Sequence, residues 1–308
     1  MITAKLAPDA MPARRRRLQA DASLLLVAFI WGGAFVAQRV AALEVGVYLF
    51  TGLRFLLAAL VLLPVAWWSR GERTGTAPMD RRSRSGVILA GLLLLLGAVF
   101  QQAGMLYTTA GNAGFITGMY VIFIPLILAI GWKQKLRPTI WLAAGLSLAG
   151  LYLLSTGGAP LWQVRLNPGD LLVLVSAIFW ACHVILIGWL AQRLDVIQVA
   201  IGQFLVCGSL STLLGLWLEP GAFPALLEHW WVVVYAGAIS AGLGYTLQIA
   251  GQRYAPPADT AVILSLEAVF AALSGWLLLG EVLAPVQLAG CGIMLGGMLL
   301  SQAHVFRR

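Results

Sequence analysis

The sequence predicts an all-α integral membrane protein of ten transmembrane helices, built as two inverted five-helix repeats with both termini cytoplasmic. Three observations predict this fold: the apolar composition, the grouping of apolar residues into helix-length runs, and a match between the two halves of the chain. Sixty per cent of the 308 residues are hydrophobic and ten per cent are charged. A water-soluble domain of this size carries more charge at its surface, so lipid must solvate much of this chain.

The apolar residues form ten runs, each long enough for a helix to cross the roughly 30 Å hydrocarbon core of a bilayer. Most connections are short, and no soluble domain fits between the runs. We therefore divide the chain into a tail at 1–21, a first repeat at 22–155, a second repeat at 170–302 and a tail at 303–308. The predicted spans are 22–43, 46–68, 86–108, 113–132, 138–155, 170–190, 196–217, 230–252, 257–279 and 285–302.

The basic residues indicate the orientation of the helices. If the N-terminus is cytoplasmic, 17 of the 20 Lys and Arg residues fall on that side, the exceptions being Arg39, Arg54 and Arg165. This is the positive-inside pattern, and an even number of crossings returns the C-terminus to the cytoplasm. We expect a multi-pass protein of the inner, or plasma, membrane. The formal charge of +8 then reflects topology, and nucleic acid is not an expected partner.

The two halves of the sequence match at an offset of 149 residues in the first two spans and 147 residues after the long loop. The matching pairs include Asp21 with Asp170, Trp31 with Trp180, Phe55 with Phe204, Gly97 with Gly244, Gln101 with Gln248, Pro138 with Pro285, and Gly150 with Gly297. Aligned Trp, Gln and Pro residues are not expected by chance. Because each half holds five spans, the second half must enter the bilayer from the opposite face. Such an inverted repeat can expose one central site to either side in turn.

Three motifs resemble those of the EamA family of the drug/metabolite transporter superfamily. They are Trp31–Phe35 (WGGAF), Arg54–Ala59 (RFLLAA), and the stretch from Glu267 to Gly290. The resemblance covers both halves and implies an inverted repeat of ten helices that exports amino acids or other small metabolites. Here Ala268 follows Glu267, where family members usually have proline.

Polar residues deep in the spans are the candidates for function, because a polar group in hydrocarbon costs several kcal/mol unless it is satisfied. Glu267, near the middle of the ninth span, is the candidate for proton coupling, and a structural acid bonded between helices is the alternative. Gln101 and Gln248 are corresponding residues that either line a cavity or join helices. The candidate substrate-binding residues are Trp31, Gln101, Tyr107, Asn112, Tyr120, Trp180, His183, Tyr245 and Gln248.

Two arginines and four glycines of the spans are predicted to be structural. Arg54 and Arg39 both lie within reach of Glu44 across the short hairpin between the first two spans, so either can form an ion pair with it. Contact of Arg54 with substrate is the alternative. The small-xxx-small spacing of Gly292 and Gly296, and of Gly114 and Gly118, predicts close helix packing.

The preferred function is a secondary transporter that exports small organic solutes by alternating access at a midplane cavity walled by spans one, three, four, six, eight and nine. A nucleotide-sugar or sugar-phosphate exchanger of the same superfamily is an alternative, but phosphate needs clustered basic residues and no lysine lies inside a span. An intramembrane enzyme is the alternative from another class, with His183 and Glu267 as its candidate groups. The three cysteines lie in different spans without paired spacing, so we expect no disulfide framework, metal site or cofactor. The expected partners are a small-molecule substrate and the bilayer.

Overall fold

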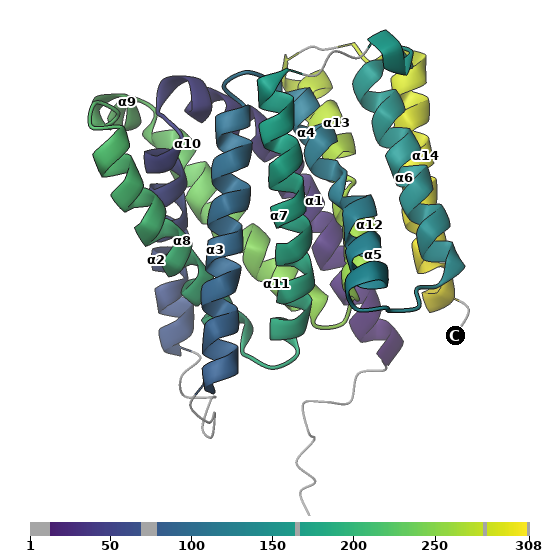
Figure 1. The fold of residues 1–308 in the computed structure, drawn as a ribbon, viewed down its shortest axis with the longest axis horizontal. Coiled ribbons are helices and arrows are strands. Elements are labelled where there is room, and N and C mark those ends of the chain that lie inside the picture. Colours follow the sequence, from purple (N-terminus) through teal and green to yellow (C-terminus); the bar gives the residue numbers. More distant parts are fainter. Residues whose placement is uncertain (1–12, 69–78, 164–166, 280–281, 307–308) are drawn as a thin grey trace, which may run out of the picture.

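The computed structural model is a bundle of helices (Figure 1). It describes residues 13–68, 79–163, 167–279 and 282–306. Ten segments in these ranges are long and apolar enough to cross a membrane, which confirms the predicted number of spans. Residues 1–12 and 307–308 of the predicted tails and Arg165 of a predicted outer loop lie outside the described residues.

The first half contains six helices that form five spans. They are α1 (Ala13–Glu44), α2 (Tyr48–Trp68), α3 (Arg81–Gly104), α4 (Ala110–Gly118), α5 (Tyr120–Gly131) and α6 (Pro138–Thr156). α4 and α5 together form the fourth span, which is interrupted at Met119. α1 begins at Ala13, before the predicted start of the span at residue 22, because the Arg-rich part of the predicted tail continues the helix beyond the apolar run.

A short helical turn, η1 (Leu161–Gln163), precedes the second half. The second half consists of α7 (Pro168–Ala191), α8 (Val196–Leu218), α9 (Phe223–Glu228), α10 (Trp230–Val234), η2 (Tyr235–Tyr245), α11 (Thr246–Gln252), α12 (Pro257–Leu264), α13 (Glu267–Leu279) and α14 (Pro285–Phe306). The eighth span combines α10, η2 and α11, and η2 is a π-helix. The ninth span combines α12 and α13 and is interrupted at Ser265 and Leu266. Leu266 corresponds to Met119, so both repeats break at the same place.

Local signals in the sequence explain where several helices begin. Asn167 and Asp170 form a capping box at the start of α7, and Asp195 accepts two backbone hydrogen bonds at the start of α8. Proline occupies the first turn of α6, α7 and α12, where its missing N–H costs no hydrogen bond. These caps place the helix ends at the two faces of the bundle.

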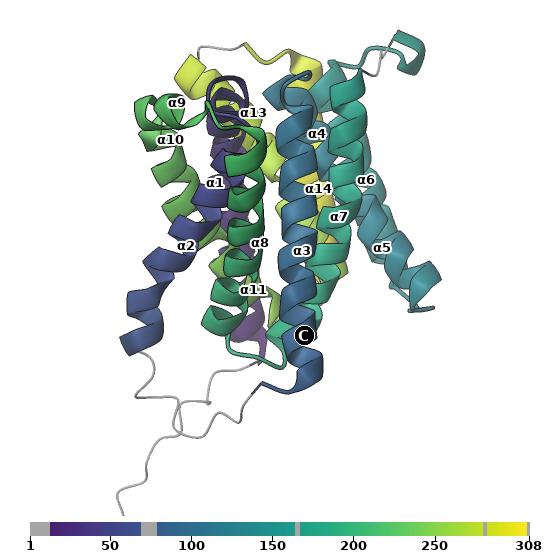
Figure 2. The same cartoon turned by 60° about the vertical axis from the view of Figure 1, so that its left-hand side comes forward.

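The second half runs through the bundle in the direction opposite to the first (Figure 1). α1 begins at the face where α14 ends, which we call the terminal face, and α7 begins at the opposite face. Corresponding helices pack together at the two edges, α2 against α8 and α6 against α14. In the centre, α3 packs against both α7 and α8, as Figure 2 also shows, and α1 packs against η2 and α11. The repeats are therefore interleaved.

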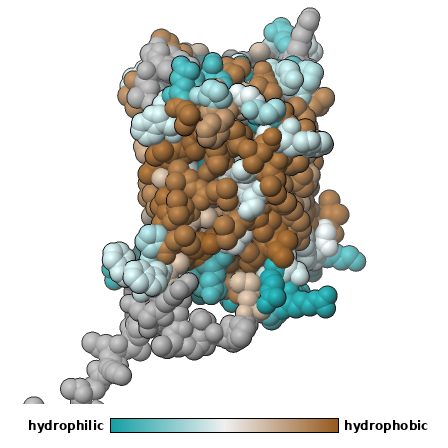
Figure 3. All heavy atoms as spheres, turned by 90° about the vertical axis from the view of Figure 1, so that its left-hand side faces the viewer, coloured by the Kyte–Doolittle hydropathy of each residue, from teal (hydrophilic) through white to brown (hydrophobic). Residues whose placement is uncertain are grey.

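The outside of the bundle is apolar between two hydrophilic ends, as Figure 3 shows for one side. Exposed Leu and Phe side chains lie along the spans, and exposed tryptophans such as Trp68 and Trp217 lie at helix ends. Tryptophan at such positions is typical of the boundary between hydrocarbon and water. The described surface is therefore that of a multi-pass membrane protein.

The close contacts of α14 lie on a different face from the one that the glycine spacing predicts. Apart from the neighbouring residues of α14 itself, no atom lies within 4 Å of the Cβ position at Gly292 or Gly296. Gly290 and Gly297 meet the backbone of α6 instead, and a Cβ atom at Gly297 would lie 3.0 Å from the carbonyl oxygen of Ala143. The spacing shows only that small residues share a face, and it does not identify which face meets a neighbour.

Gly150 allows α6 and α14 to approach closely. A Cβ atom there would lie 2.6 Å from the carbonyl oxygen of Gly290. Replacing Gly150 with Leu should push the helices apart and destabilise the protein by about 1–3 kcal/mol. Gly145, on the same helix, has no atom within 4 Å of its Cβ position and provides the control. Thermal unfolding in detergent should give a lower Tm for Gly150→Leu than for Gly145→Leu, and equal Tm values would contradict the close contact.

Candidate functional site

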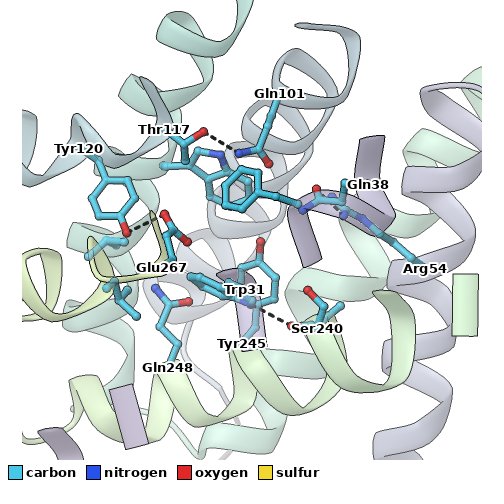
Figure 4. A pocket seen from close by; sticks show the side chains of 15 residues that line it. Trp31, Gln38, Arg54, Gln101, Thr117, Tyr120, Ser240, Tyr245, Gln248 and Glu267 are labelled. Carbon is cyan, nitrogen blue, oxygen red and sulfur yellow. Dashed lines mark hydrogen bonds between the residues drawn. The ribbon is translucent and has the colours of Figure 1, made fainter. Parts of the chain in front are cut away.

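A central cavity of about 40 Å³ lies between the two halves of the bundle (Figure 4). Its wall comes from the six spans expected to surround a site and also from α2. The volume has room for a few water molecules, so a larger solute requires the halves to move apart. Eight residues that the sequence analysis considered line the cavity: Trp31, Arg54, Gln101, Tyr120, Trp180, Tyr245, Gln248 and Glu267.

Tyr120 and Glu267 form a hydrogen bond across the pseudo-two-fold axis. The Tyr120 hydroxyl donates to Glu267 Oε1 at 3.0 Å, and both side chains are buried. The two residues are 147 positions apart and are therefore corresponding residues of the two repeats. Each begins the helix that follows the break in its span, since α5 starts at Tyr120 and α13 at Glu267. The centre of the cavity thus joins the two halves directly and holds one carboxyl group.

The two corresponding tryptophans each cover a glycine of the other half. A Cβ atom at Gly97 would lie 3.0 Å from Trp180 Cε2, and one at Gly244 would lie 2.6 Å from Trp31 Nε1. The tryptophans differ in their hydrogen bonds. Trp31 Nε1 donates to the carbonyl oxygen of Ser240 at 3.0 Å, whereas Trp180 Nε1 is buried without a partner. Trp180 therefore keeps an unpaired N–H donor beside the cavity, whereas Trp31 does not.

The corresponding glutamines also have unequal partners. Gln101 donates to Thr117 Oγ1 at 2.8 Å. Gln248 donates to Gln252 Oε1 at 3.1 Å, and its own carbonyl oxygen is buried without a partner. The cavity thus contains both an unpaired acceptor and unpaired donors, which can be satisfied by a polar solute.

Arg54 is placed differently from the expected ion pair with Glu44. It is 4% exposed and lines the central cavity, and its Nη1 donates to Gln38 Oε1 at 2.9 Å. Glu44 is exposed, and in the described part of the chain no ion pair joins it to Arg54 or Arg39. Arg54 lines the cavity inside the bundle, whereas Glu44 lies at the exposed end of α1, and a different acid contacts the hairpin. The Glu219 carboxylate accepts hydrogen bonds from three backbone N–H groups at the start of α2.

Three of the candidate substrate-binding residues lie outside the central cavity. Tyr107 is 63% exposed, just beyond the end of α3. His183 is buried beside Trp180, and its Nε2 lies 2.8 Å from Gln203 Oε1. Asn112 lines a second cavity of about 370 Å³. The sequence indicates which span each of these residues belongs to, but it does not indicate which way its side chain points.

The second cavity lies toward the opposite face, among the start of α4, the end of α6 and the start of α14. Arg39 and Asn112 contribute to its polar part. Phe35 lines both this cavity and the central one. The Phe35 side chain is therefore the boundary between the central cavity and the wider space.

A network of ion pairs closes the terminal face. Arg17 of α1 bonds to Asp21 at 2.9 Å and to Asp259 of α12 at 3.1 Å. Arg137, before α6, bonds to Asp259 at 2.9 Å. Arg17 also donates to Gln302 of α14. The network joins both halves, and it was not predicted because these arginines were interpreted only as determinants of topology.

Three polar contributors to the central cavity were not among the residues predicted from the sequence. Gln38 lies seven residues after Trp31 and so on the same helix face, a signal that was available. Thr117 lies one turn before Tyr120, which is a similar signal. Ser240 acts through its backbone carbonyl, for which a sequence carries no signal. Among the described residues, no group of three or more His, Cys, Asp or Glu side chains is placed to hold a metal ion.

Comparison with known proteins gives consistent results. A model of the EamA-like transporter family matches residues 18–156 and 167–302, once in each half. An uncharacterized transporter of Archaeoglobus fulgidus is 30% identical over 293 residues, which cover 94% of this chain and 88% of that protein. The threonine/homoserine exporter RhtA of Escherichia coli strain K12 is 27% identical over 289 residues, covering 92% and 90%. A solved crystal structure with a TM-score of 0.75 and 21% identity covers 94% of this chain and 97% of that chain, and it has the same fold.

Proposed function

The chain belongs to the EamA-like transporter family, and we propose that it is a secondary exporter of amino acids or closely related small metabolites. It works by alternating access, in which the two halves rock about the central cavity and open it to each side of the membrane in turn. The terminal face lies in the cytoplasm, a placement supported by the excess of basic residues on that side. The protein resides in the inner membrane.

The observation that carries this proposal is the contact between Tyr120 and Glu267. These corresponding residues meet at the centre of the cavity, where both spans are interrupted. Motion of one half against the other must change this contact. A solute bound at the same place contacts the residues that move. The site and the conformational change are therefore coupled by geometry.

Two features support amino acids as the substrate class. The relative RhtA is named as a threonine/homoserine exporter. In addition, the cavity combines one buried cation, one buried acid and several amides with aromatic walls, which suits a small solute that carries both charges. A nucleotide-sugar or sugar-phosphate exchanger is less well supported, because Arg54 is the one basic side chain among the described residues that line the central cavity.

The proposal is tested by reconstituting the purified protein in liposomes and measuring counterflow. Labelled threonine and homoserine should accumulate in vesicles preloaded with the same unlabelled amino acid, with saturable kinetics. Absence of flux for a broad panel of amino acids and metabolites, with and without a proton gradient, would contradict it. Flux that strictly requires a phosphate-bearing counter-substrate would favour the exchanger, and conversion of a solute into a product would indicate an enzyme.

A further inference from the structure

Arg54 is a buried cation that lacks an anionic partner among the described residues. Within the described part of the chain, its side chain makes one hydrogen bond, from Nη1 to Gln38 Oε1, and its Nε is buried without a partner. Its Cζ lies 4.8 Å from the ring centre of Phe55 and 5.2 Å from that of Phe50. These rings stabilise the guanidinium by cation–π contact, but they do not neutralise its charge.

A buried charge in this environment is costly unless an anion pairs with it. Arg54 lines the central cavity, so a solute in the cavity can reach it. The guanidinium matches a carboxylate in shape and can donate two parallel hydrogen bonds to it. We propose that Arg54, held by Gln38, is the subsite for the carboxylate group of the transported solute. This proposal rests on the proposed function and specifies how its substrate is recognised.

The other repeat shows that this subsite is specific to one half. Gln203 corresponds to Arg54, carries no charge, and contacts His183 outside the central cavity. The cation is therefore a departure from the pseudo-symmetry and not a consequence of it. Packing alone would be served as well by a neutral side chain, as it is at Gln203.

The position of Glu267 determines how a solute bound at Arg54 is oriented in the cavity. Figure 4 shows Arg54 and Glu267 at opposite sides of the cavity, with Trp31 between them. A solute with its carboxylate at Arg54 therefore extends toward Glu267, where an ammonium or hydroxyl donor finds an acceptor. An amino acid fits this polarity, and the same compound without its carboxylate charge does not.

The test uses the full-length protein in detergent and in liposomes, with three probes: threonine, its carboxamide, and 3-hydroxybutyrate, which has the carboxylate but no amino group. Binding is measured as the ligand-induced rise in Tm, and transport as inhibition of threonine counterflow. For the wild type, threonine should bind roughly 10- to 100-fold more tightly than its carboxamide. Arg54→Gln should lose this preference, because its affinity for threonine should fall while its affinity for the carboxamide stays the same. Without ligand, its Tm should not fall, because a buried unpaired charge has been removed.

Two further variants test whether the charge and the position of Arg54 determine the preference. Arg54→Lys keeps the charge and should keep a reduced preference for the carboxylate. Arg39→Gln, in the neighbouring helix and outside the central cavity, should keep the wild-type ratio. The proposal is overturned if Arg54→Gln keeps the wild-type ratio of affinities for threonine and its carboxamide. That includes the case in which both affinities fall by the same factor. A wild type that binds 3-hydroxybutyrate through Arg54 but does not move amino acids would support the subsite and contradict the proposed function.

Discussion

Replacing Glu267 with Gln should abolish the coupling of transport to a proton gradient while leaving the protein folded. Glu267 is 3% exposed and accepts a hydrogen bond from Tyr120. A glutamine retains the volume and the acceptor oxygen, but it cannot bind and release a proton. Each proton that crosses a gradient of one pH unit contributes about 1.4 kcal/mol, a tenfold accumulation ratio. Uphill transport in Glu267→Gln vesicles should therefore fall about tenfold, to the level that the substrate gradient alone supports.

Tyr120→Phe is the matched control for this experiment. It removes the hydrogen bond that Glu267→Gln can keep, and it leaves the carboxyl group in place, so its transport should still respond to the proton gradient. Counterflow, which needs no external driving force, should continue in both variants. Uphill transport by Glu267→Gln at the wild-type level would assign Glu267 a structural role and exclude it as the coupling group.

The number of spans and the repeat were predictable because both depend on composition along the chain. Apolar runs of helix length are required by the thickness of the hydrocarbon, whatever the packing. The breaks at Met119 and Leu266 and the π-helix η2 were not predicted. These features depend on contacts between helices, which no local pattern in the sequence specifies. Proline was no guide, since Pro64 and Pro125 lie inside helices.

The candidate site was predictable in part, and the limit is the rotation of each helix about its axis. Trp31, Trp180, Gln101 and Gln248 were found because the repeat gives each a partner at a related position. Tyr107 has a corresponding residue too, Tyr254, but it lies beyond the end of α3, where helical periodicity no longer gives the direction of the side chain. Apolar residues surround these helices on both the lipid side and the protein side, so the amphipathic pattern that orients a helix in water is weak here.

Arg54 and the terminal face show what the sequence cannot supply. An arginine near a short hairpin usually places its charge at the membrane surface, but Arg54 is only 4% exposed. Asp259 meets Arg17 and Arg137 across 242 and 122 positions of the chain. No local spacing connects residues so far apart, and only the packed helices bring them together.

Replacing Asp259 with Asn should open the terminal face. The Asp259 carboxylate is nearly inaccessible and pairs with both Arg17 and Arg137, which belong to the other half. Loss of one partner of a fully buried pair costs about 3–5 kcal/mol, but Arg137 is partly exposed and Arg17 keeps Asp21, so we expect about 2 kcal/mol. Under the proposed cycle, this shifts the equilibrium roughly 30-fold toward the state in which this face is open. The corresponding residue is Asn112, which lines the wide second cavity toward the opposite face.

The opening can be measured by labelling a cysteine at Leu264, which lines the central cavity, after Cys182, Cys207 and Cys291 are replaced by Ser. A membrane-impermeant maleimide added at the terminal face should react much faster in the Asp259→Asn background. Asp195→Asn is the control, because Asp195 caps α8 and asparagine preserves such a cap. Equal labelling rates in the three backgrounds would mean that the ion pairs do not hold the face closed. Faster labelling only with Asp259→Asn, together with a lower rate from the opposite face, would show that the two faces open in exchange for each other.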